Sequence, residues 1–161
     1  MLHMMRTVLT ASVGLALSGG LFAAAPTVSA QDFVDKIDSP WDMAFMKDGS
    51  MFFTEKCKGL SVRTAAGAIN KLHGVGATTG YSSASADLFC DGQAGMMGVA
   101  IDPQFATNRF IYAYSSSNAG GKLGNRVMRF KLNETMTAVS DRTDIVGDIG
   151  YKPKASKHPF G

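Results

Sequence analysis

Short runs of alternating apolar and polar residues recur along the chain, separated by glycine, Asp-Gly or asparagine-containing turns. Such runs are typical of antiparallel β-strands, in which successive side chains point to opposite faces of a sheet. Helical periodicity is nearly absent after residue 30, so the sequence predicts an all-β fold. The predicted strands lie at residues 41–45, 50–55, 60–64, 68–72, 97–101, 110–114, 125–132 and 142–149.

These strands fall into two sets of four with turns at equivalent places. "WDMAF" at 41–45 corresponds to "MGVAI" at 97–101, and "SMFFTE" at 50–55 corresponds to "FIYAY" at 110–114. A four-stranded meander repeated every roughly 55–60 residues is typical of β-propeller blades, which stack around a channel. The sequence therefore predicts about two blades. A single β-sandwich of about eight strands is the alternative at this length.

The first 30 residues form a predicted secretory signal peptide. Arg6 precedes an apolar run, and small residues at Val28 and Ala30 come just before Gln31. A membrane anchor is the alternative, but two adjacent glycines and a cleavable end favour the signal peptide. We therefore expect a mature domain at residues 31–161 and a periplasmic or secreted location in a bacterium.

The charge of the chain argues against a nucleic-acid partner. The formal charge is +3, and removing residues 1–30 takes away Arg6 and no acidic residue, which leaves +2. No Lys/Arg cluster is present. No later apolar run is long enough to span a bilayer, so no membrane span is expected after signal cleavage.

Cys57 and Cys90 are the only cysteines in the sequence. An oxidising compartment favours a disulfide between them, with two buried free thiols as the alternative. In a four-stranded meander, the turn between strands two and three lies at the same end as the loop that leaves strand four. The predicted strands put Cys57 in the first and Cys90 in the second, so both are expected near Gln93.

The segment "CDGQAGMMGVAIDP" (Cys90–Pro103) places a polar amide where a buried strand begins. Gln93 stands between Gly92 and the Ala94-Gly95 pair, and glycines allow turns and close approach of another group. Two interpretations follow from the residues alone: Gln93 is a turn residue, or its side chain contacts a ligand.

Three stretches together resemble the soluble quinoprotein sugar dehydrogenases of the glucose/sorbosone dehydrogenase family. They are "SPWDMAFMKDGSMFFTEKCKGLSVR" (39–63), "GQAGMMGVAIDPQFATNRFIYAYSS" (92–116) and "VSDRTDIVGDI" (139–149). The resemblance implies a six-bladed propeller that binds pyrroloquinoline quinone (PQQ) and calcium. It also implies that residues 31–161 are the N-terminal part of a longer, incomplete propeller domain.

The resemblance assigns Gln93 to the top face of the propeller, beside the quinone and the sugar, with flanking glycines that let the chain approach the cofactor. It places the catalytic histidine in an "H-x-G-G-R" segment after the second blade, and the chain contains no such segment. His158 is the nearest candidate, but "HPFG" departs from the pattern. We therefore expect the base, the calcium ligands and most PQQ contacts after Gly161, and no activity from residues 31–161 alone.

The implied reaction oxidises the anomeric carbon of an aldose sugar to a lactone. A neutral histidine would take the proton of the anomeric hydroxyl while PQQ accepts the hydride, and an external acceptor would then reoxidise the quinol. Two alternatives stay open: a non-catalytic periplasmic propeller that binds a protein or a sugar, and a propeller lactonase that uses metal carboxylates.

Further expectations concern three aromatic residues, His73, the methionines and metal binding. Trp41, Phe52 and Phe53 are predicted to belong to the core of the first blade. His73 is predicted to stand alone in a loop, and the methionines, Met96 and Met97 among them, are predicted to fill the core. No metal-ligand spacing is present in the sequence.

Overall fold

The computed structural model of the chain describes residues 25–75 and 87–151. The chain divides into two units, residues 1–33 and residues 34–161. In the first unit the described residues, 25–33, form no helix or strand. The predicted signal peptide lies mainly outside the described residues and His158 lies wholly outside them, so both stay predictions.

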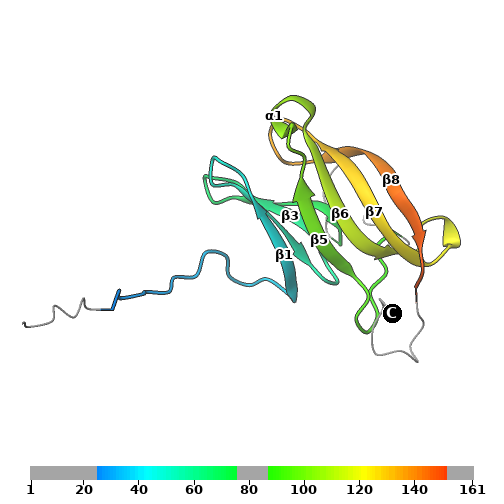
Figure 1. Cartoon of the computed structure of the whole chain (residues 1–161), viewed down its shortest axis with the longest axis horizontal. Helices are drawn as coiled ribbons and strands as arrows, with labels where there is room; N and C mark the ends of the chain where they lie inside the picture. The colour runs from blue at the N-terminus through cyan, green and yellow to red at the C-terminus, as the bar shows by residue number, and fades with distance from the viewer. Residues whose placement is uncertain (1–24, 76–86, 152–161) are drawn as a thin grey trace, which may run out of the picture. The chain divides into compact units, whose positions relative to one another are not determined.

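Two four-stranded antiparallel sheets make up the second unit (Figure 1). The first sheet has the order β1 (Pro40–Phe45), β2 (Met51–Glu55), β3 (Gly59–Arg63) and β4 (Ile69–Gly74). The second has the order β5 (Met96–Ile101), β6 (Phe110–Ser117), β7 (Gly124–Leu132) and β8 (Val139–Ile149). The predicted pair of meanders is therefore confirmed, and the chain-order pairing of both sheets favours blades over a sandwich, whose sheets exchange strands.

Two short helical turns interrupt the connections of the second sheet. The connection between β5 and β6 contains one α-helical turn, α1 (Phe105–Asn108). The connection between β6 and β7 contains the 3-10 turn η1 (Ala119–Gly121). Within the described residues, no helix has the length and apolar character that a bilayer crossing requires.

A single apolar core fills the space between facing sides of the two sheets. The register of the first sheet places Ala44, Phe52 and Val62 opposite one another on the side that faces the second sheet. Phe53 on the other side is also buried, so the prediction is confirmed for both phenylalanines, and Met96 and Met97 are buried as predicted. The buried residues of the core are Phe52, Leu60, Val62, Leu72, Leu88, Met96, Val99, Phe105, Ile111, Ala113, Met128, Phe130, Leu132 and Val139.

Trp41 is 53% exposed, so its prediction as a core residue is wrong. Ala44 and Met46 pack against the core, whereas Met43 and Phe45 are each 58% exposed. The strand was predicted correctly, but alternation alone does not say which of its two faces meets the neighbouring sheet. In β1, Asp42 and Ala44 face the second sheet, whereas Trp41, Met43 and Phe45 face away.

His73 also departs from its prediction, because it belongs to β4 and is only 2% exposed. Its ring packs on Phe130 of β7, with 4.8 Å between the ring centroids. Its Nε2 atom lies 3.8 Å from a carboxylate oxygen of Asp87. Strand β4 continues to Gly74, beyond the predicted end at residue 72, and carries His73 into the space between the sheets.

Candidate functional site

The inner edge of the sheet pair, formed by β1 and β5, is held by hydrogen bonds between side chains and backbone. The Asp42 carboxylate accepts a hydrogen bond from the Val99 N–H over 2.9 Å, and the Thr54 hydroxyl donates to the Met97 carbonyl over 2.6 Å. Both strands have an irregularity in register here, between Pro40 and Met43 in β1 and between Met96 and Val99 in β5. Such irregularities leave backbone groups without a ladder partner. Asp42 and Thr54 therefore satisfy groups of β5 across the sheet boundary.

Gln93 lies in a tight turn just before β5. The Ala94 N–H donates to the Asp91 carbonyl over 2.9 Å and closes the turn, and Gly92 adopts a φ of +58° at its first corner. A positive φ at this position favours glycine. The Gln93 side chain is exposed, and it makes no hydrogen bond to any residue in the described part of the chain. Its backbone belongs to the turn, whereas its amide is directed to solvent.

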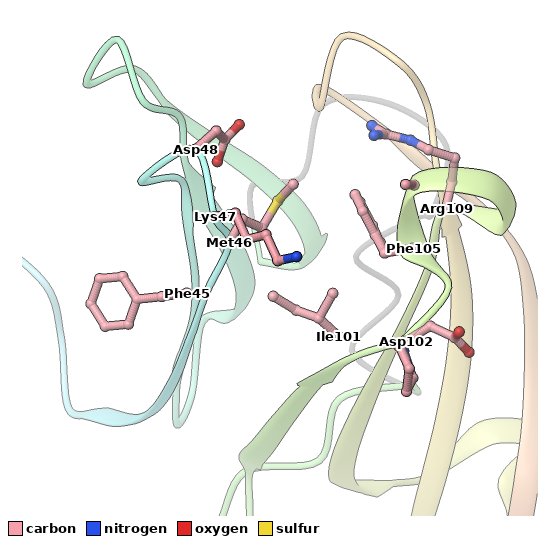
Figure 2. A pocket seen from close by; sticks show the side chains of 10 residues that line it. Phe45, Met46, Lys47, Asp48, Ile101, Asp102, Phe105 and Arg109 are labelled. Carbon is pink, nitrogen blue, oxygen red and sulfur yellow. The ribbon is translucent and has the colours of Figure 1, made fainter.

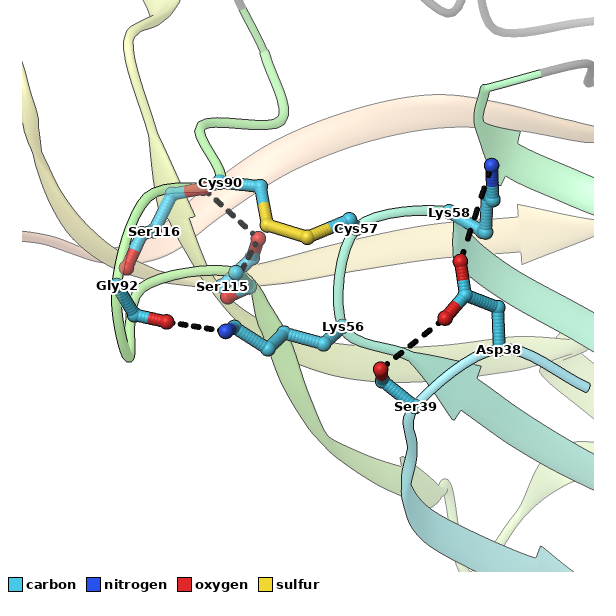
Figure 3. Close-up of a disulfide and its surroundings, with 10 residues drawn as sticks. Asp38, Ser39, Lys56, Cys57, Lys58, Cys90, Gly92, Ser115 and Ser116 are labelled. Atoms are coloured by element: carbon cyan, nitrogen blue, oxygen red, sulfur yellow. Dashed lines mark hydrogen bonds and ion pairs between the residues drawn. A yellow bond between two sulfur atoms is a disulfide. The ribbon is translucent and has the colours of Figure 1, made fainter.

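A disulfide joins Cys57, in the turn between β2 and β3, to Cys90, just before the Gln93 turn (Figure 3). The two Cα atoms are 5.3 Å apart, within the usual range for a disulfide. The predicted bridge is therefore formed, and it lies at the same end of the sheets as Gln93. The two cysteines are 33 residues apart in the sequence, so the bridge ties the first sheet to the segment that starts the second.

Gly95, one of the glycines beside Gln93, is required by a contact within the protein. A Cβ atom on Gly95 would collide with the carbonyl oxygen and the side chain of Lys56, and the Gly95 φ is +159°. The glycine is needed because β5 starts in close contact with the first sheet. The resemblance attributes the close approach to a cofactor, whereas at Gly95 the neighbouring group is Lys56 of the first blade.

The described residues fit a contact with a polar ligand more clearly than a metal site. The exposed Gln93 amide offers one carbonyl acceptor and two N–H donors, which suits a sugar hydroxyl or a quinone oxygen. Within residues 25–75 and 87–151, no group of three or more His, Cys, Asp and Glu side chains is arranged to hold a metal ion. This end of the sheets can therefore supply hydrogen bonds to a ligand.

A cavity of about 540 Å³ lies at the opposite end of β5 from Gln93 (Figure 2). It separates the turn after β1 from the loop after β5, and Lys47 and Arg109 lie on opposite sides of it. Its walls are mostly apolar. The lining residues are Phe45, Met46, Lys47, Asp48, Ile101, Asp102, Pro103, Phe105, Ala106 and Arg109.

Two of the charged residues beside this cavity are engaged in local structure. Tyr112 donates to Asp102 over 2.7 Å, and this bond, with a second from Asn108, holds the pKa of Asp102 below its ordinary value. Arg109 stacks 4.5 Å over the Phe105 ring and donates to the Asn133 carbonyl over 2.7 Å. These contacts hold Asp102 and Arg109 within the loop that follows β5.

Five charged or titratable side chains form a cluster near the outer strands, which we call the outer-edge cluster: His73, Asp87, Arg126, Arg142 and Asp144. Arg142 joins Asp87 over 2.7 Å and Asp144 over 2.8 Å, and Arg126 joins Asp144 over 2.9 Å. Burial lowers the pKa of His73 to about 4, against the opposing attraction of Asp87, so the ring is neutral at pH 7. The ion pairs of the cluster therefore join Asp87, in the segment before β5, to β7 and β8, and the neutral His73 of β4 lies beside Asp87.

The comparison with protein families agrees with the resemblance read from the sequence. The family described as Glucose / Sorbosone dehydrogenase matches residues 37–161. The chain belongs to this family. The match covers both sheets and the Gln93 turn, so these elements are parts of the family's common domain.

A sugar dehydrogenase is among the curated relatives of this chain. The chain is 29% identical over 128 residues to aldose sugar dehydrogenase YliI of Escherichia coli (strain K12), a match that covers 79% of this chain and 32% of that protein. The chain therefore spans about a third of the length of this curated relative.

Solved structures share the fold. The PQQ-bound aldose sugar dehydrogenase from Streptomyces coelicolor matches 71% of this chain and 32% of its own, with a TM-score of 0.56 and 19% identity. The apo-form of the soluble aldose sugar dehydrogenase from Escherichia coli matches 68% of this chain and 30% of its own, with a TM-score of 0.53 and 26% identity. The two sheets are therefore blades of a β-propeller.

Sequence reasoning found Gln93 and the cysteine pair but missed Asp42, Lys56 and the outer-edge cluster. Asp42 stands in the "PWD" start of the first blade, and its alternation with Trp41 and Met43 is the only sign that it faces the second blade. The cluster draws on residues between 73 and 144, and no local pattern connects them.

Proposed function

We propose that the protein containing this segment is an exported quinoprotein that oxidises aldose sugars, and that Gln93 contacts the sugar or the quinone. The observation that carries the proposal is the exposed Gln93 amide on a turn fixed by Cys90 and Gly95, in a chain of the glucose/sorbosone dehydrogenase family. The names of the relatives support the substrate class, because aldose sugar dehydrogenases are among them.

The role proposed for Gln93 is orientation of the ligand. Its amide oxygen would accept a hydrogen bond from a sugar hydroxyl, and its N–H groups would donate to a sugar or quinone oxygen. PQQ, when bound, supplies the hydride acceptor. Residues outside the described part of the chain would supply the base and the calcium ligands. The product would be a lactone, and an external acceptor would take the electrons.

A dye-reduction assay on the complete open reading frame that contains this sequence tests the proposal. We expect the purified protein, loaded with PQQ and calcium, to reduce the dye only when an aldose is present and to form the lactone. The same preparation without PQQ is the matched control. Absence of turnover with bound PQQ would contradict the proposal.

The same assay separates the alternatives. Hydrolysis of a lactone without dye reduction would favour the propeller lactonase. Sugar binding measured by calorimetry, without any turnover, would favour the non-catalytic periplasmic module. Protease protection in intact cells, compared with release by osmotic shock, tests the proposed periplasmic location.

A further inference from the structure

Lys56 contacts the segment that carries Gln93 at three successive places. Its carbonyl accepts a hydrogen bond from the Met96 N–H over 2.8 Å. Its side-chain stem lies against Gly95, where no Cβ atom would fit. Its Nζ atom donates to the Gly92 carbonyl (Figure 3). The side chain thus runs along the segment from the start of β5 to the first corner of the turn.

The last of these contacts acts on the peptide group that includes Gln93. The Gly92 carbonyl and the Gln93 N–H belong to the same planar peptide unit, so fixing the oxygen fixes the plane. The Ala94–Asp91 hydrogen bond fixes the other side of the turn. Between these two restraints, the direction in which the Gln93 side chain leaves the backbone is set.

We propose that Lys56 is a positioning residue that orients the Gln93 amide toward the ligand. The proposal rests on the function proposed above for Gln93. The disulfide reaches the same segment only at Cys90, two residues before Gly92. The Lys56 side chain contacts the turn directly at the Gly92 carbonyl. Because Gly95 has no Cβ atom, the Lys56 side chain can pass close to it.

Lys58, in the same turn of the first blade, provides a matched comparison. Its Nζ atom pairs with Asp38 over 3.9 Å, and its side chain is 43% exposed. Figure 3 shows Lys56 directed toward Gly92 and Lys58 directed toward Asp38. Lys56→Met and Lys58→Met remove the same charge at neighbouring positions, but only the first removes a contact with the Gln93 turn.

Hydrogen exchange in the complete protein tests whether Lys56 orders the turn. The measurement follows the peptide spanning residues 91–95 by mass spectrometry, without any sugar present. We expect Lys56→Met to speed exchange there about three- to tenfold, the factor for loss of one hydrogen bond, with an unchanged melting temperature. Lys58→Met is expected to leave this exchange unchanged. Unchanged exchange in Lys56→Met would overturn the positioning role while the proposed function stands.

A double-mutant cycle then tests whether Lys56 acts through Gln93. We expect Lys56→Met to lower kcat/KM for the aldose about three- to tenfold, mostly through KM, and Lys56→Arg to recover part of the loss. In a Gln93→Ala background, Lys56→Met is expected to have no further effect. An equal loss in both backgrounds would overturn the proposal. Absence of sugar oxidation by the parent protein would overturn the proposed function and, with it, the proposed contact between Gln93 and the ligand. The hydrogen-exchange result would still decide whether Lys56 orders the turn.

Discussion

The inner and outer strands of the blade pair are held by different chemistry. At the inner edge, Asp42 and Thr54 bind backbone groups of β5, so the contact depends on which residue of β5 lies opposite. At the outer edge, the cluster around Asp87 and Arg142 joins side chains to side chains through charge. The inner contacts therefore specify which residues of the two blades lie opposite one another. The stability of the outer cluster depends instead on the protonation of His73 and on the presence of each charged partner.

Removing one cation from the outer edge is expected to have the largest effect. Arg142 is 10% exposed in its side chain and bridges Asp87 and Asp144. Arg142→Met removes the arginine that pairs with the buried Asp87 carboxylate, while the more exposed Asp144 keeps Arg126. We expect a loss of about 3–5 kcal/mol of unfolding free energy, measured by urea denaturation. Lys122→Met is the control, because it breaks an exposed pair with Asp148. Its expected loss is below about 1 kcal/mol. Equal losses in both variants would remove the distinction between buried and surface charge.

Acidification is expected to weaken the outer edge through His73. Its pKa is about 4 in the fold against an ordinary value of 6.5, because burial disfavours the charged ring. Between these values the unfolded chain binds more protons, so stability is lost as the pH falls from 6.5 toward 4. The loss is of the order of 2–3 kcal/mol.

Urea denaturation across this pH range checks the His73 prediction, with His73→Gln as the comparison. Asp87, Arg142 and the Phe130 ring face the histidine, and the arginine adds to the lowering of its pKa. The variant lacks the titrating ring, so its stability should fall less steeply than that of the parent. Identical slopes would show that other groups govern the acid response.

The inner edge is expected to show a smaller effect. Asp42→Ala leaves the Val99 N–H without its acceptor at a partly buried position, and we expect a loss of about 1–2 kcal/mol. Asp42→Asn keeps one acceptor oxygen and should lose less. Urea denaturation of both variants measures the difference. A loss as large as that of Arg142→Met would mean that the inner edge carries as much of the stability as the outer one.

The strands and the repeat could be predicted because their signals are local. Alternation with period two and a turn such as Asp48-Gly49 are visible within a few residues. The disulfide could be predicted because only two cysteines exist and the meander brings their loops to the same end. The exposure of Trp41 could not be predicted, because either face of an alternating strand can meet a neighbour.

The details of the candidate site depend on contacts distant in sequence. The sequence suffices to predict Gly92 in a turn. The need for glycine at position 95 comes from its contact with Lys56, which lies 39 positions earlier in the chain. The sequence predicts His73 in a loop, because its contacts with Asp87 and Phe130 form only when the chain is folded. Such pairings need the fold before they can be recognised.

The central claim is that Gln93 serves a ligand and not the fold, and Gln93→Ala tests it most directly. Gln104→Ala is the matched control, because Gln104 precedes α1 beyond the other end of β5 and its side chain caps nothing there. In the complete PQQ-loaded protein, Gln93→Ala should lower kcat/KM for the aldose about two- to tenfold. Its unfolding free energy should change by less than about 0.5 kcal/mol, and Gln104→Ala should change neither quantity. An unchanged kcat/KM at saturating PQQ would contradict the account and leave Gln93 as a residue of the turn alone.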